Sequence, residues 1–179
     1  MTQRVALLGL SGVGKSTLVG QVAERLPLLH LQASILIRTE QAYRAQAQHT
    51  SEALRTGPVL DNQALMIAAY SRLTETATVP VVFDGHSVVD GRNGLLEIPS
   101  TVFAALSLDA ICILTAAPSV IFERRRHDIA RERPHRDVEA LAAHQAVAIA
   151  AAQRIANDLD RPFHHLETDP RARLVQLLR

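Results

Sequence analysis

Near its N-terminus the chain reads Gly9-Leu10-Ser11-Gly12-Val13-Gly14-Lys15-Ser16-Thr17, which matches the pattern G-x-x-x-x-G-K-[ST] at every fixed position. A short apolar run at residues 5–8 precedes this segment, and residues 15–26 follow it with the spacing of a helix, stopped by Pro27. Glycines let the backbone turn its N–H groups toward polyphosphate oxygens, and the helix N-terminus adds partial positive charge. The segment therefore predicts a phosphate-binding loop, called the phosphate loop below. Its candidate contacts to a nucleoside triphosphate are Gly9, Ser11, Gly12, Val13, Gly14, Lys15, Ser16 and Thr17.

Two side chains of this loop and one distant carboxylate carry specific chemistry. Lys15, the single lysine among 19 basic residues, can reach the β- and γ-phosphates, and the Ser16 hydroxyl can bind Mg²⁺. Asp84 follows the apolar run at residues 81–83 and is the natural candidate to hold hydrated Mg²⁺ through water, opposite Ser16. Capping of the next turn is the alternative role for Asp84. Asp90 is a weaker competitor because it lies among turn residues.

Apolar runs alternate with helical segments along the whole chain. We expect strands at residues 5–8, 28–32, 81–84, 110–114 and 163–167. We expect helices at residues 15–26, 34–48, 61–75, 100–106 and 138–159, with further helix starts at 118 and after 170. This alternation predicts an α/β fold whose parallel sheet is covered on both faces and binds ligands at the carboxyl ends of its strands. With no repeat or low-complexity linker, we expect one domain over residues 1–179.

Composition excludes several classes of protein. At 47% hydrophobic residues the chain can build a packed core, so disorder is not expected. No run reaches the roughly 18 apolar residues of a membrane span, so neither a membrane partner nor export is expected. The 19 basic and 18 acidic residues balance to +1, which gives little reason to expect nucleic acid as the main partner. One cysteine, Cys112, suits a reducing cytoplasm, and the oligomeric state stays open.

Six arginines crowd into a stretch of 13 residues: Arg124, Arg125, Arg126, Arg131, Arg133 and Arg136. Neighbouring acids offset only part of their mutual repulsion, and a bound polyanion would relieve the rest. The alternative is a solvated helix face with pairs such as Arg124 and Asp128. Because Pro118 and Pro134 flank the stretch, it could also form a mobile lid that excludes water.

A second substrate would need its own contacts. Arg38, on the expected helix at residues 34–48, suits an acceptor phosphate, and Arg44 and Arg55 are weaker candidates. His86, two residues beyond Asp84, could orient water or the acceptor. A surface arginine and a hydrogen-bonded turn histidine are the alternative interpretations.

The ordered set of motifs resembles the nucleoside monophosphate kinase group of P-loop proteins, and most of all the archaeal-type adenylate kinases. The matching pieces after the phosphate loop are Asp84-Gly85-His86, Gly94-Leu95-Leu96 running into Pro99, Ala116-Ala117-Pro118, Arg124-Arg125-Arg126 with Asp128, Arg136-Asp137 and His144-Gln145. The resemblance covers nearly the whole chain. Two departures lie near the acceptor side, where residues 33–37 and 96–98 replace a Gly-Asp-like turn and a Pro-Gly-rich stretch.

The resemblance implies a three-layer P-loop NTPase fold with a five-stranded parallel sheet of order 2-3-1-4-5. It implies an acceptor-binding segment at about residues 34–76, a lid at about 124–137, and ATP with Mg²⁺ as cofactors. Arg38 falls where these kinases bind the acceptor phosphate. Arg124, Arg133 and Arg136 fall near the lid arginines that contact donor and transferred phosphates, so Arg124 and Arg136 join Lys15 and Asp84 as catalytic candidates.

The leading hypothesis is phosphoryl transfer from ATP to a nucleoside monophosphate, most simply ATP + AMP giving two ADP. A second hypothesis is a P-loop ATPase that acts as a switch or assembly factor. A third is a kinase for another small metabolite.

Overall fold

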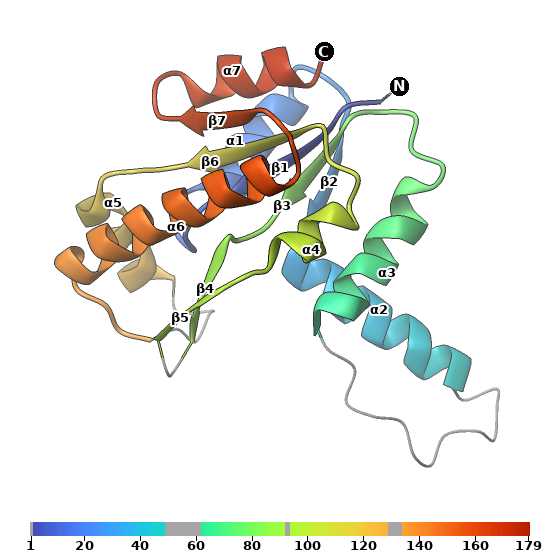
Figure 1. Ribbon diagram of the computed structural model, residues 1–179, viewed down its shortest axis with the longest axis horizontal. Coiled ribbons are helices and arrows are strands. Elements are labelled where there is room, and N and C mark those ends of the chain that lie inside the picture. The colour runs from blue at the N-terminus through green and yellow to red at the C-terminus, as the bar shows by residue number, and fades with distance from the viewer. Residues whose placement is uncertain (1, 49–61, 92–93, 129–133) are drawn as a thin grey trace.

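The computed structural model describes residues 2–48, 62–91, 94–128 and 134–179. Its centre is a five-stranded parallel sheet in the order β2-β3-β1-β6-β7 (Figure 1). The strands of this sheet are β1 (Arg4–Leu8), β2 (Leu29–Gln32), β3 (Val81–Asp84), β6 (Ala110–Leu114) and β7 (Phe163–Leu166). Because β4 and β5 form a separate sheet, the order counted within the parallel sheet is the expected 2-3-1-4-5.

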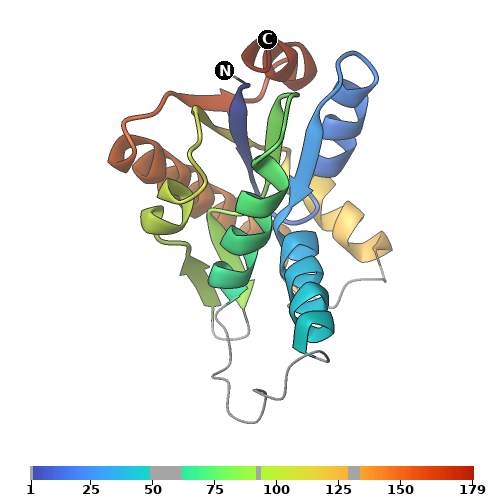
Figure 2. The same ribbon diagram turned by 90° about the vertical axis from the view of Figure 1, so that its right-hand side faces the viewer.

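Helices cover both faces of this sheet, which confirms the three-layer α/β class (Figures 1 and 2). One face carries α1 and α7, which contact each other, and the other carries α6 with α4 against it. The helices are α1 (Lys15–Ala23), α2 (Ala33–Gln48), α3 (Asn62–Thr74), α4 (Ser100–Ala104), α5 (Pro118–His127), α6 (Val138–Asp158) and α7 (Pro170–Leu177). Over the described ranges, no helix is both long and apolar enough to cross a membrane.

The central strands form the core, and their last residues lie together at one edge of the sheet. Every residue of β3 and β6 is buried, as is β1 from its second residue on. Strands buried on both faces read as continuous apolar runs, which is why the sequence pattern identifies them. Asp84 is the exception, a carboxylate that ends β3 beside Leu7 of β1. The chain leaves β1 directly into the phosphate loop, so this carboxylate lies next to that loop.

The main differences from the expectation are the end of α1 and the stretch after Asp84. Helix α1 ends at Ala23, not at residue 26, because Pro27 disfavours helical geometry in the residue before it. The stretch after Asp84 contains an unpredicted antiparallel hairpin of β4 (Val88–Gly91) and β5 (Gly94–Glu97). Its strands have four residues each and meet at two glycines, of which Gly94 has φ +110°. Its strands, VVDG and GLLE, combine apolar residues with glycine and acids, so they give no continuous apolar run, and Asp90 was expected only among turn residues.

Helices α2 and α3 lie side by side and project beyond the sheet (Figure 2). The buried carboxylate of Glu40 on α2 accepts hydrogen bonds from Arg44 Nε at 2.8 Å and from Arg72 Nη2 on α3 at 2.9 Å. The guanidinium of Arg72 also lies over the ring of Tyr43, 4.4 Å from its centroid. These contacts join the two helices, which form the described part of the predicted segment 34–76. Arg55 lies outside the described residues.

Candidate active site

A cleft of about 540 Å³ opens at the carboxyl edge of the sheet, where chemistry was expected. Four parts of the chain form its walls: the phosphate loop, the junction of β2 and α2, the end of β3, and α5. The lining residues are Ser11, Gly12, Gly14, Lys15, Ser16, Thr17, Gln32, Ala33, Ser34, Asp84, His86, Arg124 and Asp128. Most of the phosphate-loop candidates therefore share one cleft with Asp84, His86 and Arg124.

The glycines of the phosphate loop are required by its geometry. Gly12 and Gly14 have φ values of +89° and +108°, a region that other residues rarely adopt. A Cβ atom on Gly9 would lie 2.6 Å from the carbonyl oxygen of Leu114, which no side chain can tolerate. The loop thus leaves β1 in close contact with the end of β6 and turns back into α1. Backbone of this shape fits the phosphate tail of a nucleotide.

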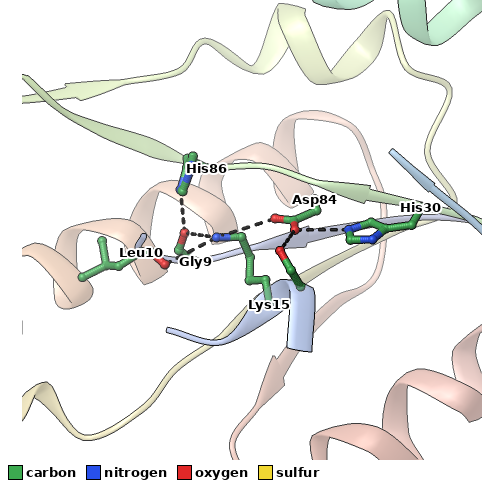
Figure 3. Close-up of polar contacts among 7 residues, drawn as sticks. Gly9, Leu10, Lys15, His30, Asp84 and His86 are labelled. Atoms are coloured by element: carbon green, nitrogen blue, oxygen red, sulfur yellow. Dashed lines mark hydrogen bonds and ion pairs between the residues drawn. The ribbon is translucent and has the colours of Figure 1, made fainter. Parts of the chain in front are cut away.

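Lys15 is held on the floor of the cleft. Its Nζ donates hydrogen bonds to the carbonyl oxygens of Gly9 at 2.9 Å and Leu10 at 3.4 Å, and lies 3.7 Å from Asp84 Oδ1 (Figure 3). The residue is only 7% exposed. A fixed and largely buried ammonium interacts more strongly with an incoming anion than an exposed one does.

Asp84 receives three polar neighbours. Ser16 Oγ donates to Asp84 Oδ2 at 3.0 Å, and His30 Nε2 donates to the same oxygen at 3.2 Å. Burial alone would raise the pKa of Asp84, but the hydrogen bond from His30, the charge of Lys15 and the hydrogen bond from Ser16 together lower it. The carboxylate is therefore ionised at neutral pH. An ionised carboxylate beside a serine hydroxyl is an oxygen donor set that suits hydrated Mg²⁺.

His86 contacts the same carbonyl group as Lys15. Its Nδ1 donates a hydrogen bond to the oxygen of Gly9 at 2.7 Å, and the ring lines the cleft (Figure 3). The segment Asp84-Gly85-His86 therefore places two polar side chains against the phosphate loop. Ser87 fixes the following backbone, because its buried hydroxyl donates to the carbonyl of Ala148 on α6 at 2.8 Å.

The clustered arginines do not share one environment. Arg124 lines the cleft, where its Nη1 donates to the carbonyl of Val13 at 2.6 Å. Arg125 Nε donates to the carbonyl of Ser11 at 2.9 Å, whereas Arg126 is exposed and pairs with Glu123. These contacts show that the stretch is not simply a solvated face.

Of the predicted lid arginines, Arg136 is not among the described residues that line the cleft. Arg136 lies against Asp90, with Nη2 3.1 Å from Oδ1 of that carboxylate. Arg133 lies outside the described residues. In this structure the guanidinium of Arg136 is therefore paired with Asp90.

On the acceptor side, Arg38 is exposed on α2 and is not among the lining residues. It stands one helical turn after Ser34, which does line the cleft, so both lie on the same face of α2. Arg44 is directed instead to Glu40 at the α2–α3 interface. Arg38 therefore shares a helix face with a lining residue without lining the cleft itself.

Sequence reasoning missed His30 as a neighbour of Asp84. A signal existed, because β2 was expected and pairs in parallel with β3. In this pairing His30 lies opposite Val82, and Gln32 lies opposite Asp84. Polar residues at the carboxyl end of a strand next to β3 are therefore candidates for contact with Asp84. Asp128, which had been noted only as a partner for Arg124, also lines the cleft.

Comparison with known proteins agrees with this geometry. The AAA domain family matches residues 8–142. An adenylate kinase of Thermococcus onnurineus (strain NA1) is 31% identical over 156 residues, covering 83% of this chain and 77% of that protein. An adenylate kinase of Thermococcus kodakarensis is 32% identical over 152 residues, with the same shares of 83% and 77%.

Among solved structures, the shikimate kinase of Acinetobacter baumannii in complex with shikimate superposes with a TM-score of 0.59. The match covers 98% of this chain and 90% of that one at 14% sequence identity. At that identity the likeness concerns the fold alone.

Proposed function

This chain belongs to the AAA domain family as an ATP-binding phosphotransferase of the P-loop kinase type, and we propose that its acceptor is a nucleoside monophosphate. The simplest such reaction is ATP + AMP giving two ADP. The adenylate kinase relatives support this choice, as does a cleft that joins the phosphate loop to the start of α2. We propose that residues 1–179 form one kinase domain with an acceptor-binding segment at about 34–76 and a lid at about 124–137.

The phosphate loop and two cations would bind the triphosphate of ATP. Lys15 already has a fixed position through Gly9, Leu10 and Asp84, so little ordering is needed when the anion arrives. Arg124 can exchange the carbonyl of Val13 for a phosphate oxygen, because its side chain is exposed to the cleft. Both cations would neutralise charge on the transferring phosphoryl group, which is where most catalysis of this reaction arises.

Ser16 and Asp84 would hold Mg²⁺, the first through its hydroxyl and the second through water. The lowered pKa of Asp84 and its hydrogen bond to Ser16 support this pairing. When bound, Mg²⁺ would neutralise charge on the β- and γ-phosphates. His30 would keep the Asp84 carboxylate oriented from the neighbouring strand.

The acceptor would approach from α2. A monophosphate is already an anion and needs no strong general base, so the task on this side is positioning. Arg38 would bind its phosphate, since it continues the cleft wall by one turn beyond Ser34. His86, which the Gly9 carbonyl orients, would contact the acceptor near the point of transfer.

The lid would exclude water, because ATP hydrolysis otherwise competes with transfer. Arg136 and Arg133 are proposed as its further phosphate contacts. For Arg136 this means exchanging Asp90 for phosphate when both substrates are bound.

One observation carries the assignment of the ATP and Mg²⁺ site: Lys15, Ser16 and Asp84 form one network at the phosphate loop. For the acceptor, the supporting observation is that the same cleft extends to Ser34 at the start of α2. The test is ATP consumption in a coupled assay against a panel of nucleoside monophosphates and small alcohols. Strong stimulation by AMP or another monophosphate supports the proposal. Hydrolysis that no acceptor changes would favour an ATPase switch, and selective use of a hydroxyl compound would favour a metabolite kinase. Calorimetry that detects no uptake of ATP with Mg²⁺ would overturn the assigned site altogether.

A further inference from the structure

The phosphate loop is supported from outside by two consecutive arginines of α5. Arg124 donates to the carbonyl of Val13, and Arg125 donates to the carbonyl of Ser11. A trans peptide unit is planar, with its C=O and N–H groups pointing in opposite directions. A donor that holds the Ser11 carbonyl therefore also sets the direction of the next N–H group, which belongs to Gly12 in the cleft lining.

The two arginines differ in burial. Arg124 is exposed, whereas the side chain of Arg125 is only 10% exposed. The stem of Arg125 packs directly on the loop, because a Cβ atom on Gly12 would lie 3.1 Å from its Cγ. Arg124 is therefore accessible to a ligand, while Arg125 belongs to the structure that shapes the loop.

A carboxylate outside the cleft lining holds the far end of Arg125. Asp90 on β4 has its Oδ2 3.6 Å from Arg125 Nη1, and its side chain is 12% exposed. Its Oδ1 accepts a hydrogen bond from Arg136 at 3.1 Å, and Oδ2 lies 3.7 Å from His144 Nδ1 on α6. One carboxylate thus faces two guanidinium groups and an imidazole, which come from three parts of the chain.

We propose that Asp90 is a positioning residue for the binding of ATP. Its charge keeps the guanidinium of Arg125 directed away from the cleft, so that Nε stays on the Ser11 carbonyl and the Gly12 N–H points to the phosphates. Without that charge, Arg125 would be drawn toward the anion in the cleft and the Ser11 peptide would lose its fixed orientation. The inference rests on the proposed function only in that the anion bound by the loop is ATP.

The test compares two variants that break the same chain of contacts at different links. Asp90→Asn removes the charge at nearly constant size. Arg125→Lys keeps a cation but removes the Nε donor to Ser11. Each should weaken the affinity for ATP with Mg²⁺ about tenfold, the scale of one hydrogen bond to a charged group. The double variant should be no weaker than either single one, because both act through the Ser11 carbonyl.

The affinity is measured by calorimetry well below the melting temperature, together with KM for ATP and for the acceptor. A merely structural role would lower the melting temperature and leave the ATP affinity of the folded protein unchanged. Glu97→Gln is the matched control. It removes a carboxylate from the same hairpin, and that carboxylate pairs with the exposed Arg154. That variant should bind ATP like the wild type.

Wild-type ATP affinity in Asp90→Asn would overturn the inference, and so would wild-type affinity in Arg125→Lys or additive losses in the double variant. If Asp90→Asn fails to fold, Arg125→Lys still tests the link from Arg125 to Ser11 on which the role of Asp90 depends, and wild-type ATP affinity in that variant would overturn the inference. The measurement uses ATP without acceptor, so it separates the two proposals. Weakened ATP binding in an enzyme that uses no monophosphate would support the role of Asp90 and refute the proposed acceptor.

Discussion

The two walls of the cleft differ in how far their charges are fixed before a substrate binds. On the loop wall, Lys15 and Asp84 are 7% and 8% exposed and are held by each other and by backbone carbonyls. On the α2 wall, Arg38 is exposed, and the buried charge of that helix, Glu40, serves the contact with α3. The comparison teaches that the proposed contacts to ATP are fixed in the core of the sheet before a ligand binds. The proposed contact to the acceptor is an exposed side chain, which would become ordered when the acceptor binds.

The largest effect is expected on the loop wall at Lys15. Lys15→Ala should lower turnover by about 10³-fold or more, because it removes the cation nearest the transferring phosphoryl group. Steady-state kinetics measures the loss, and circular dichroism checks that the fold is intact. Arg126→Ala is the control, since that arginine is exposed and its described contacts are with Glu123 and with the ring of Phe122 on its own helix. If Lys15→Ala turned over as fast as the wild type, the assignment of the active site to this cleft would be wrong.

Asp84→Asn should come next, with a fall of about 10²-fold in kcat and a higher Mg²⁺ requirement. The change keeps a partner for Ser16 and removes the negative charge that would hold the cation. A Mg²⁺ titration of the rate at saturating ATP measures it. Asp109→Asn, at the opposite end of the sheet where Asp109 accepts from the Arg4 amide, should not alter the titration. An unchanged Mg²⁺ dependence in Asp84→Asn would exclude the metal role.

On the α2 wall, Arg38→Ala should raise KM for the acceptor about tenfold and leave KM for ATP unchanged. The selectivity follows from the position of Arg38 beyond Ser34 and away from the loop. Arg44→Ala is the control on the same helix, because it faces Glu40 and should affect stability alone. If Arg38→Ala raised both KM values equally, the two walls would not divide the substrates as proposed.

The smallest effect is expected on the pH dependence of stability, through Glu40 at the interface between α2 and α3. The hydrogen bond from Arg72 lowers the pKa of Glu40 most strongly, against the opposing effect of burial, and Arg44 lowers it further. A carboxylate whose pKa is lowered in the folded state stabilises the protein at pH values above its unfolded-state pKa of 4.5. That contribution is lost as the pH falls through the folded-state pKa.

The melting temperature of Glu40→Gln should therefore lie below that of the wild type at neutral pH, by about 2–4 °C for each kcal/mol lost. The gap should narrow as the pH falls below 4.5, because protonation of Glu40 removes the charge that its arginine partners stabilise. Thermal unfolding followed by circular dichroism across this range measures the gap. A gap of constant size would show that charge on Glu40 contributes nothing.

Much of the fold could be predicted because its signals are local. Central strands such as residues 110–114 are apolar throughout, and parallel strands buried on both faces must be so. The hairpin at Asp90 was missed because its strands, VVDG and GLLE, interrupt their apolar residues with glycine and acids and so show neither a continuous apolar run nor an alternation. The same holds for the site. Asp84 could be predicted because it ends an apolar strand, whereas the contacts that join Asp90 through Arg125 to Ser11 have no signature in the sequence.

Nine consecutive residues were enough to predict the phosphate loop. A backbone that turns around phosphate requires glycines at set intervals and a lysine beside them. Folding decided how distant residues divide the work. His30 meets Asp84 across 54 positions, and Arg125 meets Ser11 across 114. Arg124 and Arg125 are chemically identical neighbours, yet one is exposed in the cleft and the other is buried behind the loop. The helical rotation between consecutive residues directs them to different surroundings, and those surroundings exist only once the sheet and α5 have packed.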